Sequence, residues 1–158
     1  MTNSSKTSPR VLFRSFAFAE AVTWTALILG LVGKQFWAWP QPAVTVIGGI
    51  HGAVFLGYGV IAALVGVNQR WSFWKIFLAT VLAIVPYATI PFELNVDRKR
   101  QLEGTWRKTH SGEPQDDHWF DRLYRWYINR PVLLALTLVV VVVAIFTTLL
   151  LLGPPQFN

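Results

Sequence analysis

The chain contains no cysteine among its 158 residues, and only 14% of its residues are charged. The absence of cysteine excludes disulfide scaffolds, Cys-ligated zinc sites, thiolate nucleophiles and iron–sulfur clusters. Soluble domains average about a quarter charged residues, so this charged fraction is too low for an ordinary soluble domain. With 53% hydrophobic residues and a mean hydropathy of +0.42, the composition instead favours a membrane protein.

Four apolar stretches approach or exceed the ~20 residues that a helix needs to cross about 30 Å of hydrocarbon. They lack the two-residue alternation of membrane β-strands, and backbone groups inside a bilayer must pair within their own segment, so helices are predicted. We therefore expect an all-α integral membrane protein with four transmembrane helices. The expected spans are residues 11–33, 43–67 and 72–94, which form a three-helix membrane core over 11–94, and residues 131–153.

Polar segments flank and separate these spans. Residues 1–10 are expected to form a flexible N-terminus and residues 154–158 a short tail, whereas residues 95–130 form a polar loop. Within this loop, aromatic residues recur at helical spacing over 116–130 with charged residues on the opposite face. This pattern predicts an amphipathic helix that lies in the membrane interface, or alternatively one that packs its aromatic stripe on the protein itself.

We interpret the net charge of +6 as an indication of how the chain is oriented in the membrane, and not as an indication of nucleic-acid binding. Basic residues alternate with acidic ones over 93–121 and flank apolar stretches, which is unlike a nucleic-acid-binding surface. With four spans, five of the 14 Lys and Arg residues lie on the side of the termini and nine on the side of the polar loop. Because basic residues concentrate on the cytoplasmic side, residues 95–130 are predicted to be cytoplasmic and both termini outside.

Glu20 and His51 are the polar residues that most need a reason to lie inside the membrane. Each lies about 10–17 Å along its helix from the connection between the first two spans, so an antiparallel pair of helices would bring them to a similar depth. A carboxyl group at that depth costs a few kcal/mol on insertion scales. We expect the two side chains to form an intramembrane polar pair, which either responds to protons or only fixes the packing of the two spans. Glu93, near the end of the third span, is expected to be an interfacial carboxylate.

Small and amphipathic residues predict how the helices pack and where they meet the headgroups. Gly48 and Gly52 form a small-xxx-small pattern that Ala53 and Gly57 repeat, and this pattern would let two helix backbones approach closely. Tryptophan and arginine collect at the membrane interface, so several of them are expected to be interfacial anchors. These anchors are Arg14, Trp37, Trp39, Trp71, Trp74, Trp119 and Trp126.

Short motifs in the first three spans resemble a known family. They are Phe13-Arg14 with Glu20 and Thr23, then Ile50-His51-Gly52 with Tyr58, and then Val85-Pro86-Tyr87. This combination is similar to the domain-of-unknown-function 3817 family of small bacterial integral membrane proteins, over residues 12–99. The sequence departs from the family pattern at Ala21, Thr23 and Tyr87-Ala88, and the polar segment and the fourth span beyond the resemblance are an addition to it. The resemblance implies a bacterial plasma membrane location and no particular reaction.

Two functions fit these features. The first is a non-enzymatic accessory or assembly subunit of a larger bacterial membrane complex, such as a respiratory one, because no nucleophile–base or metal-ligand pattern is visible. The second is a small oligomeric transporter or proton-responsive carrier that uses Glu20 and His51. We expect no cofactor and no metal, and as partners the lipid bilayer together with a protein partner or further copies of the chain.

Overall fold

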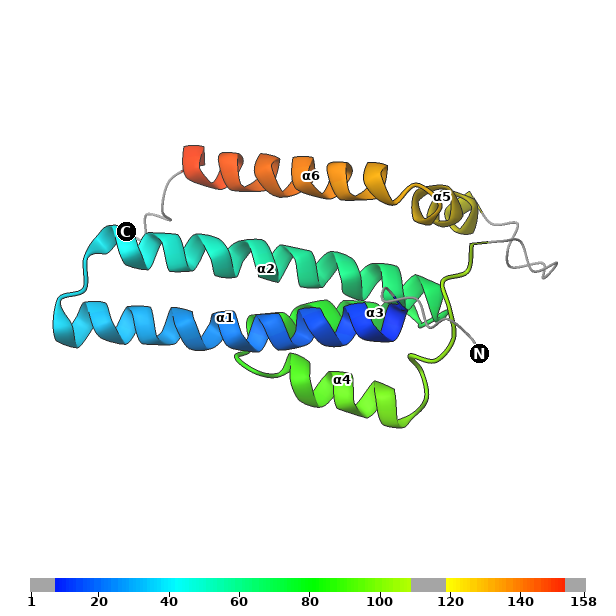
Figure 1. The fold of residues 1–158 in the computed structure, drawn as a ribbon, viewed down its shortest axis with the longest axis horizontal. Coiled ribbons are helices and arrows are strands. Elements are labelled where there is room, and N and C mark those ends of the chain that lie inside the picture. The colour runs from blue at the N-terminus through cyan, green and yellow to red at the C-terminus, as the bar shows by residue number, and fades with distance from the viewer. Residues whose placement is uncertain (1–7, 109–118, 153–158) are drawn as a thin grey trace. The chain divides into compact units, whose positions relative to one another are not determined.

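The computed structural model describes residues 8–108 and 119–152, which contain helices and no strand (Figure 1). The chain consists of two compact units, Met1–Arg107 and Lys108–Asn158, and each is described by itself. The helical fold class is as predicted, and the following paragraphs take the elements in chain order.

Two long antiparallel helices form the frame of the first unit. Helix α1 spans Pro9–Trp37 and begins at Ser8, whose side chain accepts a hydrogen bond from the backbone N–H of Val11. Helix α2 spans Gln41–Asn68 after a short connection in which Ala38 adopts a left-handed conformation, with a φ of 51°. At 29 and 28 residues, each helix is about 42–43 Å long and exceeds the hydrocarbon thickness of about 30 Å.

The third expected span is not one helix. Helix α3 spans Phe73–Val81 and continues as the short 3-10 helix η1, Leu82–Ile84, before helix α4 spans Thr89–Arg98. The prediction of a continuous span over 72–94 is therefore wrong. Pro86 explains the break, because a residue before proline avoids the helical conformation and Val85 accordingly has an extended ψ of 122°. Tyr87 then reverses the chain with a φ of 65°.

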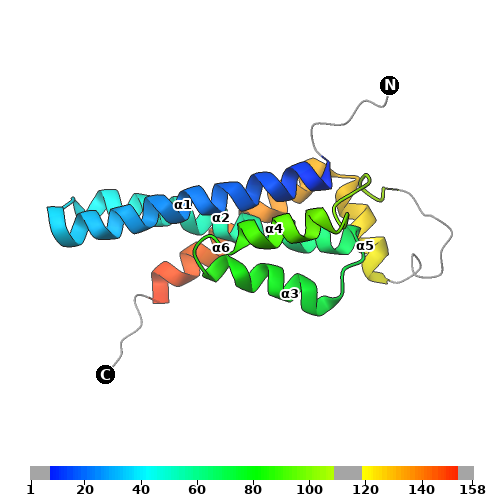
Figure 2. The same cartoon turned by 90° about the horizontal axis from the view of Figure 1, so that it is seen from below.

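The α3–η1–α4 segment is a helical hairpin that returns to the end of the α1–α2 pair from which it starts (Figures 1 and 2). At its tip, the indole Nε1 of Trp24 donates a hydrogen bond to the carbonyl of Ala83 at 3.1 Å. At its base, Arg10 forms an ion pair with Asp97 at 2.6 Å. We call the end that holds the start of α1 and the ends of α2 and α4 the shared end, and the end at Ala38–Pro40 the turn end.

This return contradicts the predicted placement of residues 95–107 relative to the N-terminus. That prediction placed residues 95–130 on the side of Lys34, opposite the N-terminus of the chain. The structure places residues 95–107 at the shared end instead, because Asp97 contacts both Arg10 and Arg14 in the first two turns of α1. The Lys34 side chain belongs to the last turn of α1, at the turn end.

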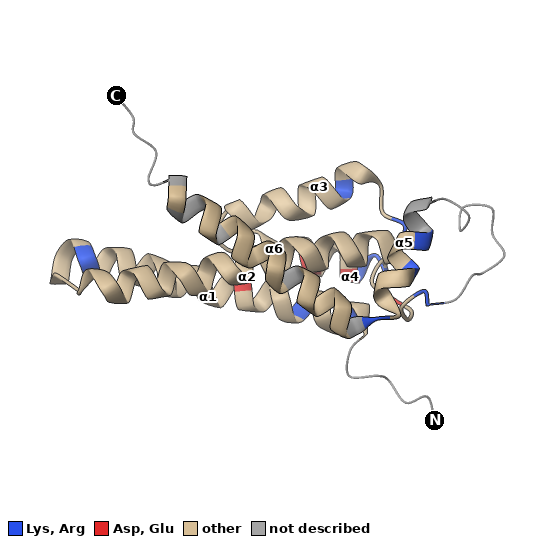
Figure 3. Cartoon of the chain, turned by 90° about the horizontal axis from the view of Figure 1, so that it is seen from above, with Lys and Arg blue, Asp and Glu red and all other residues tan. Residues whose placement is uncertain are grey.

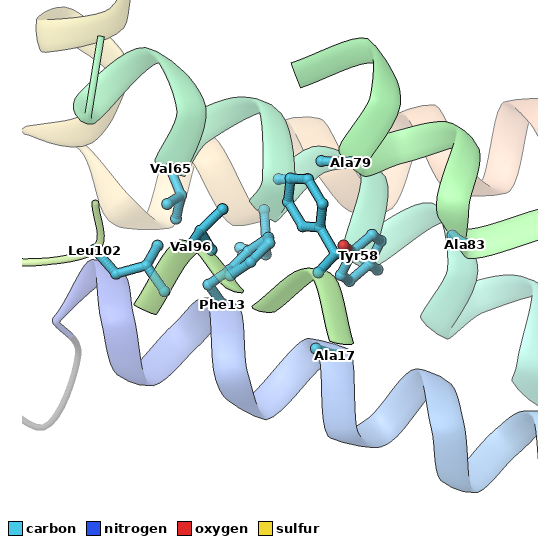
Figure 4. Close-up of a cluster of buried hydrophobic side chains, with 11 residues drawn as sticks. Phe13, Ala17, Tyr58, Val65, Ala79, Ala83, Val96 and Leu102 are labelled. Carbon is cyan, nitrogen blue, oxygen red and sulfur yellow. The ribbon is translucent and has the colours of Figure 1, made fainter. Parts of the chain in front are cut away.

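The apolar core of the first unit lies between these helices at the shared end (Figure 4). Phe13 is fully buried, and its ring centroid lies 5.7 Å from those of both Tyr58 and Trp71 and 6.3 Å from that of Phe92. The core thus joins α1 to α2, α3 and α4. Its buried members are Phe13, Ala17, Tyr58, Ile61, Ala62, Val65, Ala79, Ala83, Phe92, Val96 and Leu102.

The second unit contains two helices. Helix α5 spans Trp119–Ile128, within the expected amphipathic helix over 116–130, of which 116–118 lie outside the described residues. Helix α6 spans Pro131–Leu152 and occupies the expected fourth span. The Asn129 side chain between them donates a hydrogen bond to the carbonyl of Lys108 at 2.9 Å.

The described residues contain two helices long and apolar enough to cross a membrane, α1 and α2. A third span would be present if Arg122–Ile128 and Val132–Ile145, which meet at 100°, count as one bent span. The described residues thus support two or three of the four expected spans, and the stretch expected to form the third span is divided between the short helices α3 and α4.

Candidate intramembrane polar site

Glu20 lies on the buried face of α1. Phe13, Ala17 and Glu20 follow one another at three- and four-residue spacing, so that they share one side of the helix. Glu20 has no exposed surface, and neither of its carboxylate oxygens has a hydrogen-bond partner among the described residues. An unpartnered buried polar group costs about 1–3 kcal/mol, and more if it is charged, so the position calls for a functional or structural reason.

Tyr58 is a second buried polar group without a partner. Its side chain is fully buried in α2, and its hydroxyl forms no hydrogen bond within the described part of the chain. The helices α1, α2 and α4 thus each contribute a buried polar side chain to the first unit, namely Glu20, Tyr58 and Glu93.

The expected hydrogen bond between Glu20 and His51 is not formed. The Nδ1 atom of His51 instead lies 3.1 Å from the hydroxyl oxygen of Thr23, and this hydroxyl donates to the backbone carbonyl of Glu20 at 3.1 Å. Because a hydroxyl has a single proton, the arrangement fits an imidazole whose Nδ1–H donates to Thr23. His51 is buried, and its ring centroid lies 4.5 Å from that of Trp24. His51 thus contacts α1 at Thr23, about one helical turn beyond Glu20.

A network of ion pairs extends from the buried Glu93 carboxyl to the shared end. Arg14 donates to Glu93 at 2.8 Å and to Asp97 at 2.7 Å, and Arg10 also pairs with Asp97. The Glu93 side chain is only 4% exposed, whereas that of Arg14 is 49% exposed. Glu93, which we expected to be an interfacial carboxylate, is thus buried in the protein and paired with Arg14, because its α4 helix folds back along α1.

Hydrogen bonds to arginine also define the charge state of Asp97. The bond from Arg10 is the main reason that the pKa of Asp97 lies below its ordinary value, and the charges of Arg10 and Arg14 act in the same direction. Asp97 is thus held as a carboxylate that fixes the end of α4 to α1. A hydrogen bond from buried Thr89 to the carbonyl of Ala17, at 3.3 Å, fixes the start of α4 in the same way.

The structure places the predicted packing glycines in different surroundings. A Cβ atom on Gly57 would lie 2.6 Å from the Phe16 ring, so α1 and α2 approach closely there. A Cβ atom on Gly48 would reach only Leu27, at 3.9 Å, and Gly52 is partly exposed. The three glycines therefore do not form one uniform contact face.

The predicted anchors lie where the helices end. Trp37 is 66% exposed and Trp39 is 42% exposed at the turn end, and Trp74 is 73% exposed at the shared end. Trp71 is partly buried and donates a hydrogen bond to the carbonyl of Gln101 at 3.3 Å. Trp126 is 45% exposed in α5, and the Trp119 side chain lies outside the described residues.

The buried acidic groups of the first unit are Glu20 and Glu93. In the described ranges 8–108 and 119–152, no three His, Asp or Glu side chains gather as a metal site would require. Sequence reasoning identified Glu20 and His51 from their apolar surroundings. It missed the role of Glu93, because nothing in the sequence placed α4 beside Arg14.

Comparisons with known proteins agree with a membrane location. The membrane protein SCO5905 of Streptomyces coelicolor is 31% identical over 103 residues, which cover 63% of this chain and 12% of that protein. The uncharacterized membrane protein YdzA of Bacillus subtilis is 24% identical over 80 residues, or 51% of this chain and 83% of that protein. This chain therefore matches only a small part of SCO5905 but most of YdzA.

No solved structure matches the chain. A family model matches residues 11–98, a stretch that includes all of α2, α3 and α4 and nearly all of α1. Because this match covers more than half of the sequence, the chain belongs to the family described as Domain of unknown function (DUF3817).

Proposed function

We propose that the protein is a non-enzymatic accessory or assembly subunit of a larger complex in the bacterial plasma membrane. The observation that carries this proposal is the match to SCO5905, in which the similar segment makes up 12% of a much longer membrane protein. In SCO5905 the segment is attached to the rest of a longer membrane protein, which holds the two at a high effective concentration and favours contact between them.

The surface of the first unit supports such an association. At the turn end, α1 and α2 extend beyond the α3–α4 hairpin and expose large apolar side chains, including Leu29, Val46 and Ile50 at more than half of their surface (Figure 2). A Cβ atom on Gly49 would meet nothing within 4 Å. Helices in membranes associate through small residues that permit close approach, so this part of α2 offers a contact for a partner helix.

Gentle detergent extraction followed by mass spectrometry tests the proposal. We expect the full chain to be recovered with one or more membrane proteins. A Gly49→Leu variant should lose them, whereas Val22→Leu, a change at an exposed position of α1, should retain them. Recovery of the wild-type chain only as a free monomer would contradict the proposal.

A second candidate function is a proton-responsive carrier, and the unpartnered Glu20 and Tyr58 side chains favour it. Buried polar groups left without partners are costly, and proteins retain such costs at functional sites. The Phe16 ring already packs against Gly57. An oligomer would therefore have to use the more open surface at Gly48 and Gly49.

Purified protein in liposomes tests this second function. A carrier that uses Glu20 should show a pH-dependent flux of protons or solute, and Glu20→Gln should abolish the flux without lowering the Tm. Glu103→Gln is the matched control, because Glu103 is an exposed carboxyl at the shared end. An absence of flux in wild-type liposomes over a range of pH would exclude the carrier.

A further inference from the structure

The basic residues of the first unit are distributed very unevenly between its two ends (Figure 3). Among its described residues, Lys34 is the basic residue at the turn end. All the others belong to the start of α1, to the segment between α2 and the first turn of α3, or to the end of α4 and the residues that follow it. They are Arg10, Arg14, Arg70, Lys75, Arg98, Lys99, Arg100 and Arg107.

The return of the α3–α4 hairpin is what brings these residues to one end. Trp24, which contacts the hairpin tip, lies ten residues beyond Arg14 on α1. At a rise of 1.5 Å per residue this is about 15 Å, or half of the hydrocarbon thickness. If Arg14 lies at the membrane boundary, a hairpin of this length would reach about the middle of the bilayer and then turn back, as a re-entrant segment does.

The polar groups at the tip have partners that make such a turn tolerable. Non-helical backbone is accepted at membrane depth only where protein or water satisfies it. Trp24 donates to the carbonyl of Ala83, and the backbone N–H groups of Val85 and Ala88 donate to the carbonyls of Leu82 and Val85. The Tyr87 hydroxyl lies 3.2 Å from that of Thr25.

We propose that the first unit crosses the membrane twice, with the α3–α4 hairpin re-entrant from the cytoplasmic side, and that its shared end binds the anionic headgroups of the cytoplasmic leaflet. Basic residues near span ends concentrate in the cytoplasm, and each one near an anionic leaflet strengthens the attraction. This orientation is the reverse of the one expected from four spans for the N-terminus, because that count assigned residues 95–107 to the wrong end.

The basic residues available to lipid are those whose charges are not fully engaged in ion pairs within the protein. Arg10 and Arg14 are engaged by Asp97 and Glu93. Arg98, Lys99 and Arg100 are exposed at the end of α4, and Arg100 has only a loose pair with Glu103, at 3.7 Å. These three residues form the principal headgroup contact of the proposal.

Aromatic residues beside this cluster fit the same membrane surface. Phe73 and Trp74 are 71% and 73% exposed at the start of α3. The Lys75 ammonium lies 4.3 Å from the centroid of the Trp71 ring. Exposed tryptophans next to basic residues are typical of the headgroup region, where an apolar ring and a charged group are both accommodated.

The absence of cysteine permits a direct test of the topology. Single variants Gln35→Cys at the turn end and Thr105→Cys at the shared end place a thiol at exposed positions. In intact cells, a membrane-impermeant maleimide should label Gln35→Cys only, and in inverted vesicles it should label Thr105→Cys only. Leu29→Cys, in the middle of α1, should remain unlabelled in both preparations.

Each other labelling pattern overturns part of the proposal. If Gln35→Cys and Thr105→Cys are labelled from the same face, the hairpin crosses the membrane and is not re-entrant. If they are labelled from opposite faces with Thr105→Cys outside, the hairpin is re-entrant but the shared end does not face the cytoplasmic leaflet.

Native mass spectrometry of the full-length protein in detergent tests the lipid contact. The wild-type chain should retain added phosphatidylglycerol in preference to phosphatidylcholine, and inorganic phosphate should not displace it. The combined variant Arg98→Gln, Lys99→Gln and Arg100→Gln should bind phosphatidylglycerol about tenfold or more weakly. Lys34→Gln, which removes the charge at the turn end, should bind it like the wild type.

Two further measurements keep this test decisive. Rising salt should weaken phosphatidylglycerol retention by the wild-type chain, because screening reduces attraction between exposed charges. The Tm of the triple variant shows whether it is folded. A folded triple variant that retains phosphatidylglycerol like the wild type would overturn the proposed contact, as would equal retention of both lipids by the wild type or displacement by phosphate.

Discussion

Glu20 shows most clearly how a single residue can work against the stability of the fold. Its carboxylate oxygens are buried without a partner, although the helices around them are closely packed. Replacing a buried unsatisfied group with an apolar one of similar volume is often neutral or stabilising. If Glu20 serves a function, the wild-type chain therefore retains it at the expense of stability.

This reasoning predicts that Glu20→Met raises the free energy of unfolding by about 1–3 kcal/mol. Thermal unfolding in detergent measures the effect, with Glu103→Met as a control at an exposed carboxyl that should shift stability by no more than about 0.5 kcal/mol. A clear loss of stability in Glu20→Met would show that the carboxyl is satisfied in the folded protein and that its role is structural.

The same residues show what sequence reasoning can reach at this scale. Glu20 and His51 stood out because polar groups are scarce in the apolar stretches, and both are indeed buried. Their partners could not be predicted, because depth along a helix does not give the direction in which a side chain points. Thr23, three residues from Glu20, takes the bond to His51 that Glu20 was expected to make.

At the scale of elements, the α3–α4 hairpin is the main departure from the sequence prediction. Average hydropathy over 72–94 does not distinguish one crossing helix from two short helices that meet at a turn. Pro86 explains why the helix breaks, and the left-handed conformation of Tyr87 turns that break into a reversal of the chain. The contact between Arg14 and Glu93, at 2.8 Å, follows from that reversal. It could not be predicted from a sequence that did not reveal the reversal.

Ion pairs at the base of the hairpin predict a loss of stability in acid. Because hydrogen bonding to Arg10 lowers the pKa of Asp97 in the folded state, its stabilising effect is complete above the unfolded value of about 3.9 and disappears as the pH falls through the folded pKa. We expect the Tm of the wild-type chain to exceed that of Asp97→Asn at neutral pH, and the difference to close in acid. A difference that stays constant down to about pH 3 would contradict this role.

Replacement by alanine should have opposite effects on stability at two glycines of α2. A Cβ atom on Gly66 would lie 2.5 Å from Ile76 and 3.3 Å from Trp71, where α2 packs against α3, whereas one on Gly49 would meet nothing within 4 Å. Gly66→Ala should therefore destabilise the chain by about 1–3 kcal/mol. Gly49→Ala should stabilise it by up to about 1 kcal/mol, because alanine favours helix. Equal Tm values for the two variants would show that α3 does not pack closely on α2.

At the scale of the whole molecule, the chain combines a family core with a further unit. The family match ends at residue 98, and the buried apolar cluster ends at Leu102. The side chain of Asn68 fastens the following residues to the end of α2, since it accepts a hydrogen bond from the backbone N–H of Arg107 at 2.8 Å and donates one to the carbonyl of Thr105 at 3.3 Å. The first unit is thus closed by its own contacts at Arg107.

This closure predicts that a chain ending at Arg107 inserts into the membrane and folds alone. YdzA supports the expectation, because 80 residues similar to this chain make up 83% of its length. The shortened chain should have a Tm within a few degrees of the full chain, and its Gln35→Cys and Thr105→Cys variants should label from the same faces as in the full chain. The matched control is a chain ending at Thr89, which lacks the carboxylates that bind Arg10 and Arg14 and should lose thermal stability. If the chain ending at Arg107 is degraded or labels differently, the second unit is required to build the first, and the two are not independent.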